Sequence, residues 1–583
     1  MRFLRMLTNA LVGGALGASY LTVLVLQLNP HVPIASETTW RWFATLGLFY
    51  GVHLAVLFYL LMMAREFFSL DPLSPGWASV RLLAWMAAGL AALASTLMWL
   101  NVRGFEAALG DTATRRMTAG AAATSAAAVI LLGIAIAHYS FGRRGSRVGA
   151  ALFVIAAFGS LALPLAARGP ATGALPAPSA RWAPSPDEVS ARRVVMLLLD
   201  GVSLEYIWPQ AAAGRLPNFA RLLDTGATLD LATVRPTGPG PVWASVATGL
   251  YPDKTGVRSG AHYTAWNAPQ PVDLLPDHCF SHALVHLGAV RQVPSTSEAW
   301  RARPLWSLLS DAGIRVGVVR WPLTYPAPAV DGFVVSDRFH ELLGSMKELD
   351  EAAAFPAGSL PVVRSAFIES NDGDVQAPVV PAAAGAVSAG APEVHASRRD
   401  AGYSRTMRDL RAGDEARFLA LRYQGLDTIG HYYMGDTQPG VVADSDGHDR
   451  RRHVQVLERY YSYIDAELGS TLAALAPEDL LLVVSGFGIQ RQSAVKQIAG
   501  RLLGDPDMTG THDRAPDGFL LAYGDTVQPG RLQRGSIVDV TPTVLYYFGL
   551  PVGRDMEGHA RTDIFTPEFT TERPIAFIPS YNK

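Results

Sequence analysis

The chain has 583 residues, which is enough for a membrane unit and a large soluble domain. Its formal net charge at pH 7 is -2, so the charge balance gives no indication of a nucleic-acid partner. Cys279 is the only cysteine, which excludes an internal disulfide framework and a thiolate metal site. We expect this lone cysteine to be a small buried apolar side chain.

Apolar residues make up 49% of the chain and concentrate near its beginning. Five apolar stretches approach the roughly 20 residues that cross a bilayer, at 7–28, 40–63, 82–100, 119–138 and 148–167. The first is longer than the apolar core of a signal peptide, and four more follow it. The sequence therefore predicts a membrane unit of about five helices over 1–167. A transporter is a weaker interpretation than an anchor, because no charged residue lies deep inside a stretch.

Arginine placement predicts how these helices are oriented. Seven arginines lie on one side of the predicted membrane, namely Arg2, Arg5, Arg65, Arg81, Arg143, Arg144 and Arg147. Four others oppose the bias: Arg41, Arg103, Arg115 and Arg116. The larger group favours a cytoplasmic N-terminus, and an odd number of spans then places the rest of the chain on the far side. Abundant arginine and alanine favour a bacterial source, so we expect an inner-membrane protein with a periplasmic C-terminal domain.

The stretch 168–191 is rich in proline and alanine and is predicted to be a linker. After it, short apolar runs at 193–199, 316–320 and 480–484 are typical of strands buried on both faces. Helical patterns at 216–225 and 454–475 alternate with them, which predicts an α/β domain over 192–583. Within that domain, 338–412 is expected to be an insertion or cap region, and 369–397 a low-complexity surface loop or lid.

Several motifs follow one another in this domain: RRVVMLLLDGVS ending near Asp200, GRLPNFARLLDTGATL, RPTGPGPVWASVATGLYPDKTGV, RWPLTYPAPAVDGFVVSD, YQGLDTIGHYYMG, GTHDRAPDGFLLAYG and SIVDVTPTVLYYFGLPVGRDMEGH. Together, over roughly 192–565, they resemble the alkaline-phosphatase superfamily, in its type I phosphodiesterase/nucleotide pyrophosphatase branch. The resemblance implies an α/β/α sandwich with a central mixed, mostly parallel sheet. It also implies metal-dependent hydrolysis of phosphate esters.

In that family two zinc ions clamp the attacking and leaving oxygens of a phosphoryl group, and a Thr or Ser hydroxyl attacks phosphorus. Carried over by motif, the first zinc would be held by Asp427, His431 and His512. The second would be held by Asp200, the nucleophile, and an Asp-His pair on a late strand. Without a metal, Asp200 could instead be a helix N-cap, and Asp427 with His431 could be an ordinary pair one helical turn apart.

The sequence departs from the family at the second zinc. Pro239 occupies the nucleophile position and has neither hydroxyl nor N–H. Thr237, two residues earlier, is a weak substitute because the shift displaces its hydroxyl by several ångströms. Gly486 and Phe487 stand where the family has the late Asp-His pair. The sequence therefore predicts at most one zinc ion, with Asp200 as a weaker ligand.

These departures favour a degenerate family member that acts in binding or regulation at the membrane. The alternative is an active single-metal hydrolase of phosphate or sulfate esters, in which metal-bound water attacks and Asp200 is the base. Either way, the expected partners are the membrane and a phosphate- or sulfate-ester ligand, and no nucleic acid is expected.

Overall fold

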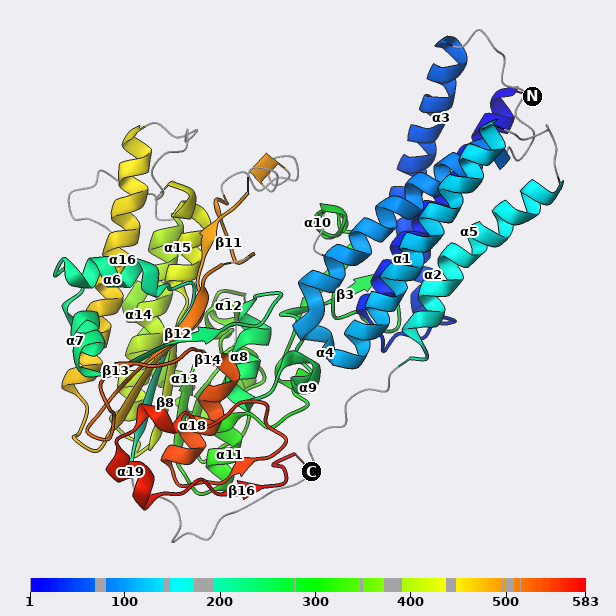
Figure 1. Cartoon of the computed structure of the whole chain (residues 1–583). Helices are drawn as coiled ribbons and strands as arrows, with labels where there is room; N and C mark the ends of the chain where they lie inside the picture. Colours follow the sequence, from blue (N-terminus) through cyan, green and yellow to red (C-terminus); the bar gives the residue numbers. More distant parts are fainter. Residues whose placement is uncertain are drawn as a thin grey trace. The chain divides into compact units, whose positions relative to one another are not determined.

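The structure is a computed structural model, and it describes residues 2–68, 80–140, 147–171, 192–276, 279–345, 350–371, 391–436, 447–493, 497–498, 508–513 and 515–582. Most of the predicted linker, 172–191, and most of the low-complexity segment, 372–390, lie outside these residues, as does the side chain of Cys279. The chain divides into a helical unit, Met1–Ala174 with Ala261–Pro294, and an α/β unit, Leu175–Gly260 with Ser295–Lys583. Figure 1 follows both units from the N-terminus to the C-terminus.

Among the residues that the structure describes, five helices of the helical unit are long and apolar enough to cross a membrane: Phe3–Leu28, Glu37–Arg65, Val80–Glu106, Ala108–Ala137 and Arg147–Arg168. The first span is α1 (Arg2–Leu28), and the second is α2 (Glu37–Leu46) joined through the π-helical turn Gly47–Gly51 to α3 (Val52–Phe68). The third and fourth spans both lie in α4 (Val80–Ser140), and the fifth is α5 (Arg147–Arg168). A positive φ of 69° at Gly110 breaks α4 into two spans, a conformation that glycine adopts without steric cost. The prediction of five apolar spans is confirmed, and the chain is a membrane protein.

An unexpected part of the helical unit comes from the middle of the predicted α/β domain. The segment Ala261–Pro294 contains an antiparallel hairpin of β3 (Ala261–Ala265) and β4 (Val290–Pro294), with α10 (Cys279–His286) between the strands. Its contacts lie with the spanning helices. The motifs on both sides of this segment predict that it belongs to the α/β domain. Its packing against helices more than 200 residues away could not be predicted, because no local sequence pattern specifies such a contact. The predicted domain limits of 167 and 192 stay predictions.

Within the described residues, the α/β unit is built on a ten-stranded sheet of order β13-β2-β12-β9-β1-β8-β5-β6-β7, with β14 also paired to β2. Its strands are β1 (Val194–Leu199), β2 (Ala227–Ala232), β5 (Val316–Val319), β6 (Gly332–Val335), β7 (Ala354–Phe355), β8 (Phe418–Tyr423), β9 (Leu480–Phe487), β12 (Asp517–Tyr523), β13 (Gly530–Arg531) and β14 (Gly535–Ser536). The central strands β9, β1, β8, β5 and β6 run parallel, whereas β12 and β7 pair antiparallel with their neighbours. Every residue of β1, β8 and β9 is buried, as expected for strands covered on both faces.

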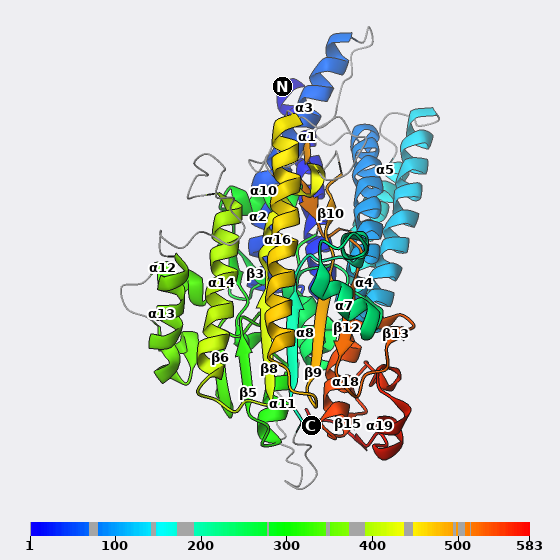
Figure 2. The same ribbon diagram turned by 90° about the vertical axis from the view of Figure 1, so that its left-hand side faces the viewer.

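Helices cover both faces of this sheet, as Figure 2 shows from the side of α14 and α16. One face buries a core with α6 (Leu204–Ala212), α7 (Pro217–Thr225), α12 (Phe339–Ser345), α13 (Leu360–Asn371), α14 (Pro392–Arg411), α15 (Gly425–Tyr433) and α16 (Gly447–Ala473). The other face carries α8 (Pro239–Thr248), α11 (Leu305–Asp311) and α18 (Val540–Tyr547), and α9 (Pro252–Thr255) and α19 (Pro567–Glu572) are peripheral. The predicted α/β/α sandwich with a mixed, mostly parallel sheet is confirmed.

Candidate metal centre

Four of the predicted site residues lie beyond the carboxyl ends of neighbouring parallel strands. Asp200 follows β1 directly, and Asp427 and His431 lie one turn apart on α15, which follows β8. His512 follows the short strand β11 (Gly510–Thr511), which pairs with β10 (Gln490–Arg491) just after β9. Ligands bind at this edge in open α/β sheets, since the loops after adjacent parallel strands meet there.

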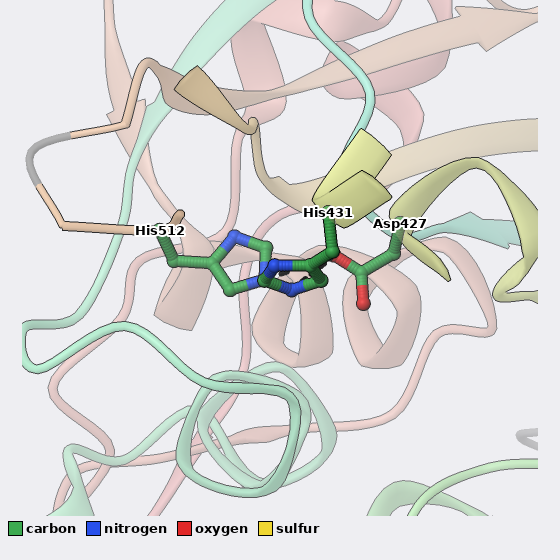
Figure 3. Close-up of side chains that lie close together, drawn as sticks. All are labelled: Asp427, His431 and His512. Carbon is green, nitrogen blue, oxygen red and sulfur yellow. Dashed lines mark hydrogen bonds and ion pairs between the residues drawn. The ribbon is translucent and has the colours of Figure 1, made fainter. Parts of the chain in front are cut away.

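Asp427, His431 and His512 form a compact cluster, shown in Figure 3. The Nε2 atoms of His431 and His512 are 3.0 Å apart. Asp427 Oδ1 lies 2.9 Å from His512 Nε2 and 3.7 Å from His431 Nε2. One ligand atom from each residue lies within 4.8 Å of the others, and the Asp427 side chain is buried.

Backbone carbonyls fix both imidazoles in the orientation of metal ligands. His431 Nδ1 lies 3.0 Å from Gly510 O, and His512 Nδ1 lies 3.1 Å from Gly488 O. A carbonyl oxygen can only accept, so each Nδ1 carries a proton and each neutral Nε2 presents a lone pair. Two lone pairs that face each other at 3.0 Å repel unless a proton or a metal cation lies between them. A carbonyl behind each ligating histidine is the usual arrangement around zinc.

The aspartate fits the same interpretation. Asp427 Oδ1 is buried and accepts no hydrogen bond of ordinary geometry from any residue that the structure describes. Burial opposes its ionisation, but the neighbouring imidazoles of His512 and His431, when protonated, outweigh burial and lower the pKa of Asp427. Burial likewise opposes the charging of His512, yet the neighbouring carboxylate raises the pKa of that imidazole. Protons and a metal ion would therefore compete for the same three side chains, and the donor set fits a single zinc ion.

Asp200 is close to this cluster but is bonded to protein groups. A Cβ placed on Gly201 would lie 2.7 Å from Asp427 Cα, so the two loops are in contact. Trp243 Nε1 donates to Asp200 Oδ1 at 2.7 Å, and Arg422 donates to Oδ2 through Nε at 3.0 Å and through a terminal nitrogen. Asp200 is fully buried, and Arg422 is nearly so. Arg422 and Asp200 form a buried salt bridge. Burial alone would lower the pKa of the Arg422 guanidinium, but the Asp200 carboxylate beside it raises that pKa. Burial raises the pKa of Asp200, and Arg422 opposes that effect.

The residues that depart from the family pattern offer no free hydroxyl, carboxylate or imidazole. Pro239 is the first residue of α8, and all nine residues after it in that helix are buried. Phe487 ends β9 fully buried, with its ring centroid 4.7 Å from that of His512. A Cβ placed on Gly486 would lie 2.4 Å from Val242 Cγ1, which leaves no room for a longer side chain. The Thr237 hydroxyl donates to Val234 O at 3.1 Å.

Sequence reasoning missed Arg422 and Trp243, the two partners of Asp200. A signal for Arg422 was present, since it is the one charged residue in the apolar run FLALRY of β8. A charge in a strand buried on both faces requires a buried counter-ion. Trp243 carried no such signal, because an indole in an apolar helix is ordinarily a core residue.

The fold and the aspartate-histidine cluster define a member of the alkaline-phosphatase superfamily. A family profile described as type I phosphodiesterase/nucleotide pyrophosphatase matches residues 194–517, which is more than half of the chain. The chain belongs to the type I phosphodiesterase/nucleotide pyrophosphatase family, whose members are metal-dependent.

Solved structures of distant relatives resemble the chain. Two structures of murine ectonucleotide pyrophosphatase/phosphodiesterase 5, one of them an inactive variant in complex with AMP, are 12% identical over 64% of this chain and 100% of their own, with a TM-score of 0.38. The human protein of the same name is 11% identical over the same shares, also with a TM-score of 0.38. No curated protein matches the chain.

Proposed function

We propose that this chain is a degenerate member of its family, anchored in a bacterial inner membrane, whose periplasmic α/β unit binds a ligand without transferring a phosphoryl group. Its role is then binding or regulation at the membrane, and its ligand is a phosphate or sulfate ester. The α/β unit holds at most one zinc ion.

The ion pair of Asp200 with Arg422 is the observation that carries this proposal. The family's second zinc needs the carboxylate after β1 as a ligand, and here both of its oxygens accept hydrogen bonds from Trp243 and Arg422. A guanidinium also repels a divalent cation at such short range, and this repulsion is strong inside a protein. At the second zinc position, the Asp200 carboxylate is therefore already bonded to protein groups, and the Arg422 guanidinium adds a positive charge that competes with zinc.

The groups around the ion pair support the same conclusion. Pro239, at the start of α8, offers no hydroxyl to attack phosphorus and no N–H to hold a phosphate oxygen. The alternative hydroxyl, on Thr237, is engaged with a backbone carbonyl. Phe487 presents an apolar ring beside His512, where a charged oxygen would lose its hydration without a replacement.

Asp427, His431 and His512 are the residues that would hold the remaining zinc. With three protein ligands the ion keeps an open position, through which it supplies positive charge to an anionic oxygen of a ligand. This chemistry is compatible with binding alone. It also keeps the single-metal hydrolase open as the second candidate, which is favoured by the convergence of both Nε2 atoms on Asp427 Oδ1.

One experiment separates the two candidates. The full chain, purified in detergent and loaded with zinc, is tested for metal content and for turnover of bis(4-nitrophenyl) phosphate. We expect no more than one zinc per chain and no turnover above that of the His512→Ala variant. Zinc-dependent turnover that His512→Ala abolishes would replace the binding proposal with the single-metal hydrolase. Two zinc ions per chain would overturn the role assigned to Arg422.

A further inference from the structure

Side chains at the end of the first span and the start of the second form hydrogen bonds with main-chain atoms of the hairpin segment Ala261–Pro294. Asn29, fully buried just after α1, donates to Leu274 O at 2.7 Å and accepts from the amides of Asp273 and Leu274 at 2.8 and 3.0 Å. The amide of Gln270 donates to Thr38 Oγ1 at 3.2 Å. Such bonds fix the segment's position along the helices, because each joins a defined residue of one to a defined residue of the other.

Apolar packing strengthens this attachment. Four residues of the segment, Ala265, Val272, Leu284 and Val290, share one buried cluster with Val25, Leu26, Val32, Trp42 and Leu46 from the first two spans and their loop. Leu274 joins a second cluster with Leu28 and with residues around the kink of α4. The segment therefore lies against the sides of the helices as well as against their ends, and Figure 1 shows β3 and α10 beside them.

The depth of the contact follows from helix geometry. The second span covers Glu37–Arg65, 29 residues. At 1.5 Å per residue it is about 43 Å long, which matches the roughly 40–45 Å of a bilayer with its head groups. With Glu37 at one face of the bilayer and the span along the bilayer normal, Arg41 lies about 6 Å below that face, where head groups give way to hydrocarbon. Arg41 donates to Trp266 O at 2.7 Å, so the tip of the hairpin lies at that boundary.

The side chains at the tip are those expected at a lipid boundary. Trp266 and Leu287 are each 60% exposed, and Trp40, on the first turn of α2, is 67% exposed. Ala265 pairs with Val290, so Trp266 and Leu287 leave the same end of the hairpin. Exposed tryptophans at the level of the head groups are typical of membrane interfaces.

We propose that the hairpin segment Ala261–Pro294 is a membrane-interface element whose tip, with Trp266 and Leu287, inserts among lipid head groups beside the second span. The occupant of this apolar surface is the bilayer itself, because the surface is continuous with the spans. The segment contains Asp273, Asp277 and Arg291 and no lysine, so the interaction depends on burial at the interface and not on anionic lipids. The α/β unit is thereby attached to the membrane twice, through its linker and through this segment.

The test places single labels on the full chain in phosphatidylcholine nanodiscs. In a Cys279→Ser background, a fluorophore is attached at Trp266→Cys or Leu287→Cys. The matched controls are Ile155→Cys, which is 68% exposed on α5, and Val362→Cys, which is 38% exposed on α13 of the α/β unit. Quenching is measured with lipids that carry a nitroxide on the head group or deep in the chain, and with iodide in water. The contact of Trp266 with Arg41 uses a backbone carbonyl, so the cysteine variant retains it.

We expect the head-group nitroxide to quench both tip labels several-fold more than the label at 362. We expect the deep nitroxide to quench both tip labels less than the label at 155. Adding anionic lipid should not change this. Equal behaviour of the tip labels and the label at 362 would show that the hairpin faces water and would overturn the proposal. Protection of the tip from both lipid-borne quenchers and iodide would overturn it as well, because a protein surface would then cover the tip.

Discussion

Replacing Arg422 with methionine tests the buried ion pair on which the proposed function depends. Methionine keeps most of the side-chain volume and removes the charge, so Asp200 is left as a buried carboxylate with only the indole of Trp243 as a donor. Breaking a buried pair in this way typically costs about 3–5 kcal/mol. Unfolding entropy of roughly 2.1 cal/mol/K per residue over an α/β unit of this size converts 4 kcal/mol into a fall in Tm of about 5 °C.

The control is a surface pair on the same unit. Arg315, whose side chain is 46% exposed, binds Asp331 and Asp414, so Arg315→Met should cost less than about 1 kcal/mol. Adding Asp200→Asn to Arg422→Met should recover half or more of the loss, because the amide oxygen still accepts from Trp243 and no charge remains buried. Thermal unfolding of the full chain in detergent, followed by tryptophan fluorescence, gives all four values. If Arg422→Met and Arg315→Met shift Tm equally, or if the double variant is less stable than Arg422→Met, the pair does not have the role assigned to it.

Four further predictions follow from the site and the topology. Elemental analysis should find no more than one zinc per chain, and His431→Ala should remove it. Pro239→Thr should not restore turnover of an aryl phosphodiester, because Gly486 and Phe487 would still replace two ligands of the second zinc. Recovery of activity would contradict the degenerate interpretation. Burial and then nearby arginines lower the pKa of His340 to about 2, so the unfolded state, with a pKa of about 6.5, takes up the proton first. Stability should therefore fall by about 2–3 kcal/mol between pH 6.5 and 4.5 and much less in His340→Gln, measured as the pH dependence of Tm. A phosphatase reporter fused after Ala191 should be active, and activity of a cytoplasmic reporter alone would reverse the predicted topology.

Local patterns were sufficient to predict the layers of the fold. The run 193–199 predicted a strand buried on both faces, and β1 is that strand, with every residue buried between β8 and β9. Hydropathy predicted the spans 82–100 and 119–138. In the structure both continue as helix up to the break at Gly110, because polar residues near a membrane surface still form helix where the backbone allows it. The hairpin segment was not predictable, since its position depends on contacts such as Asn29 with Leu274, which no local pattern encodes.

The ion pair at the end of β1 explains why motif reasoning is less informative about metals than about folds. An ionised aspartate that is buried loses its hydration and needs a neighbouring cation to offset that free-energy cost. Zinc and a guanidinium can each provide the positive charge. Asp200 keeps its place in the motif in either case, so its presence alone does not indicate a metal. The decisive residue is Arg422, on the neighbouring strand, which bonds the same carboxylate. At the cluster of Asp427, His431 and His512 no arginine makes such a bond among the residues that the structure describes, and burial, lone pairs and charge there still require a proton or a metal ion.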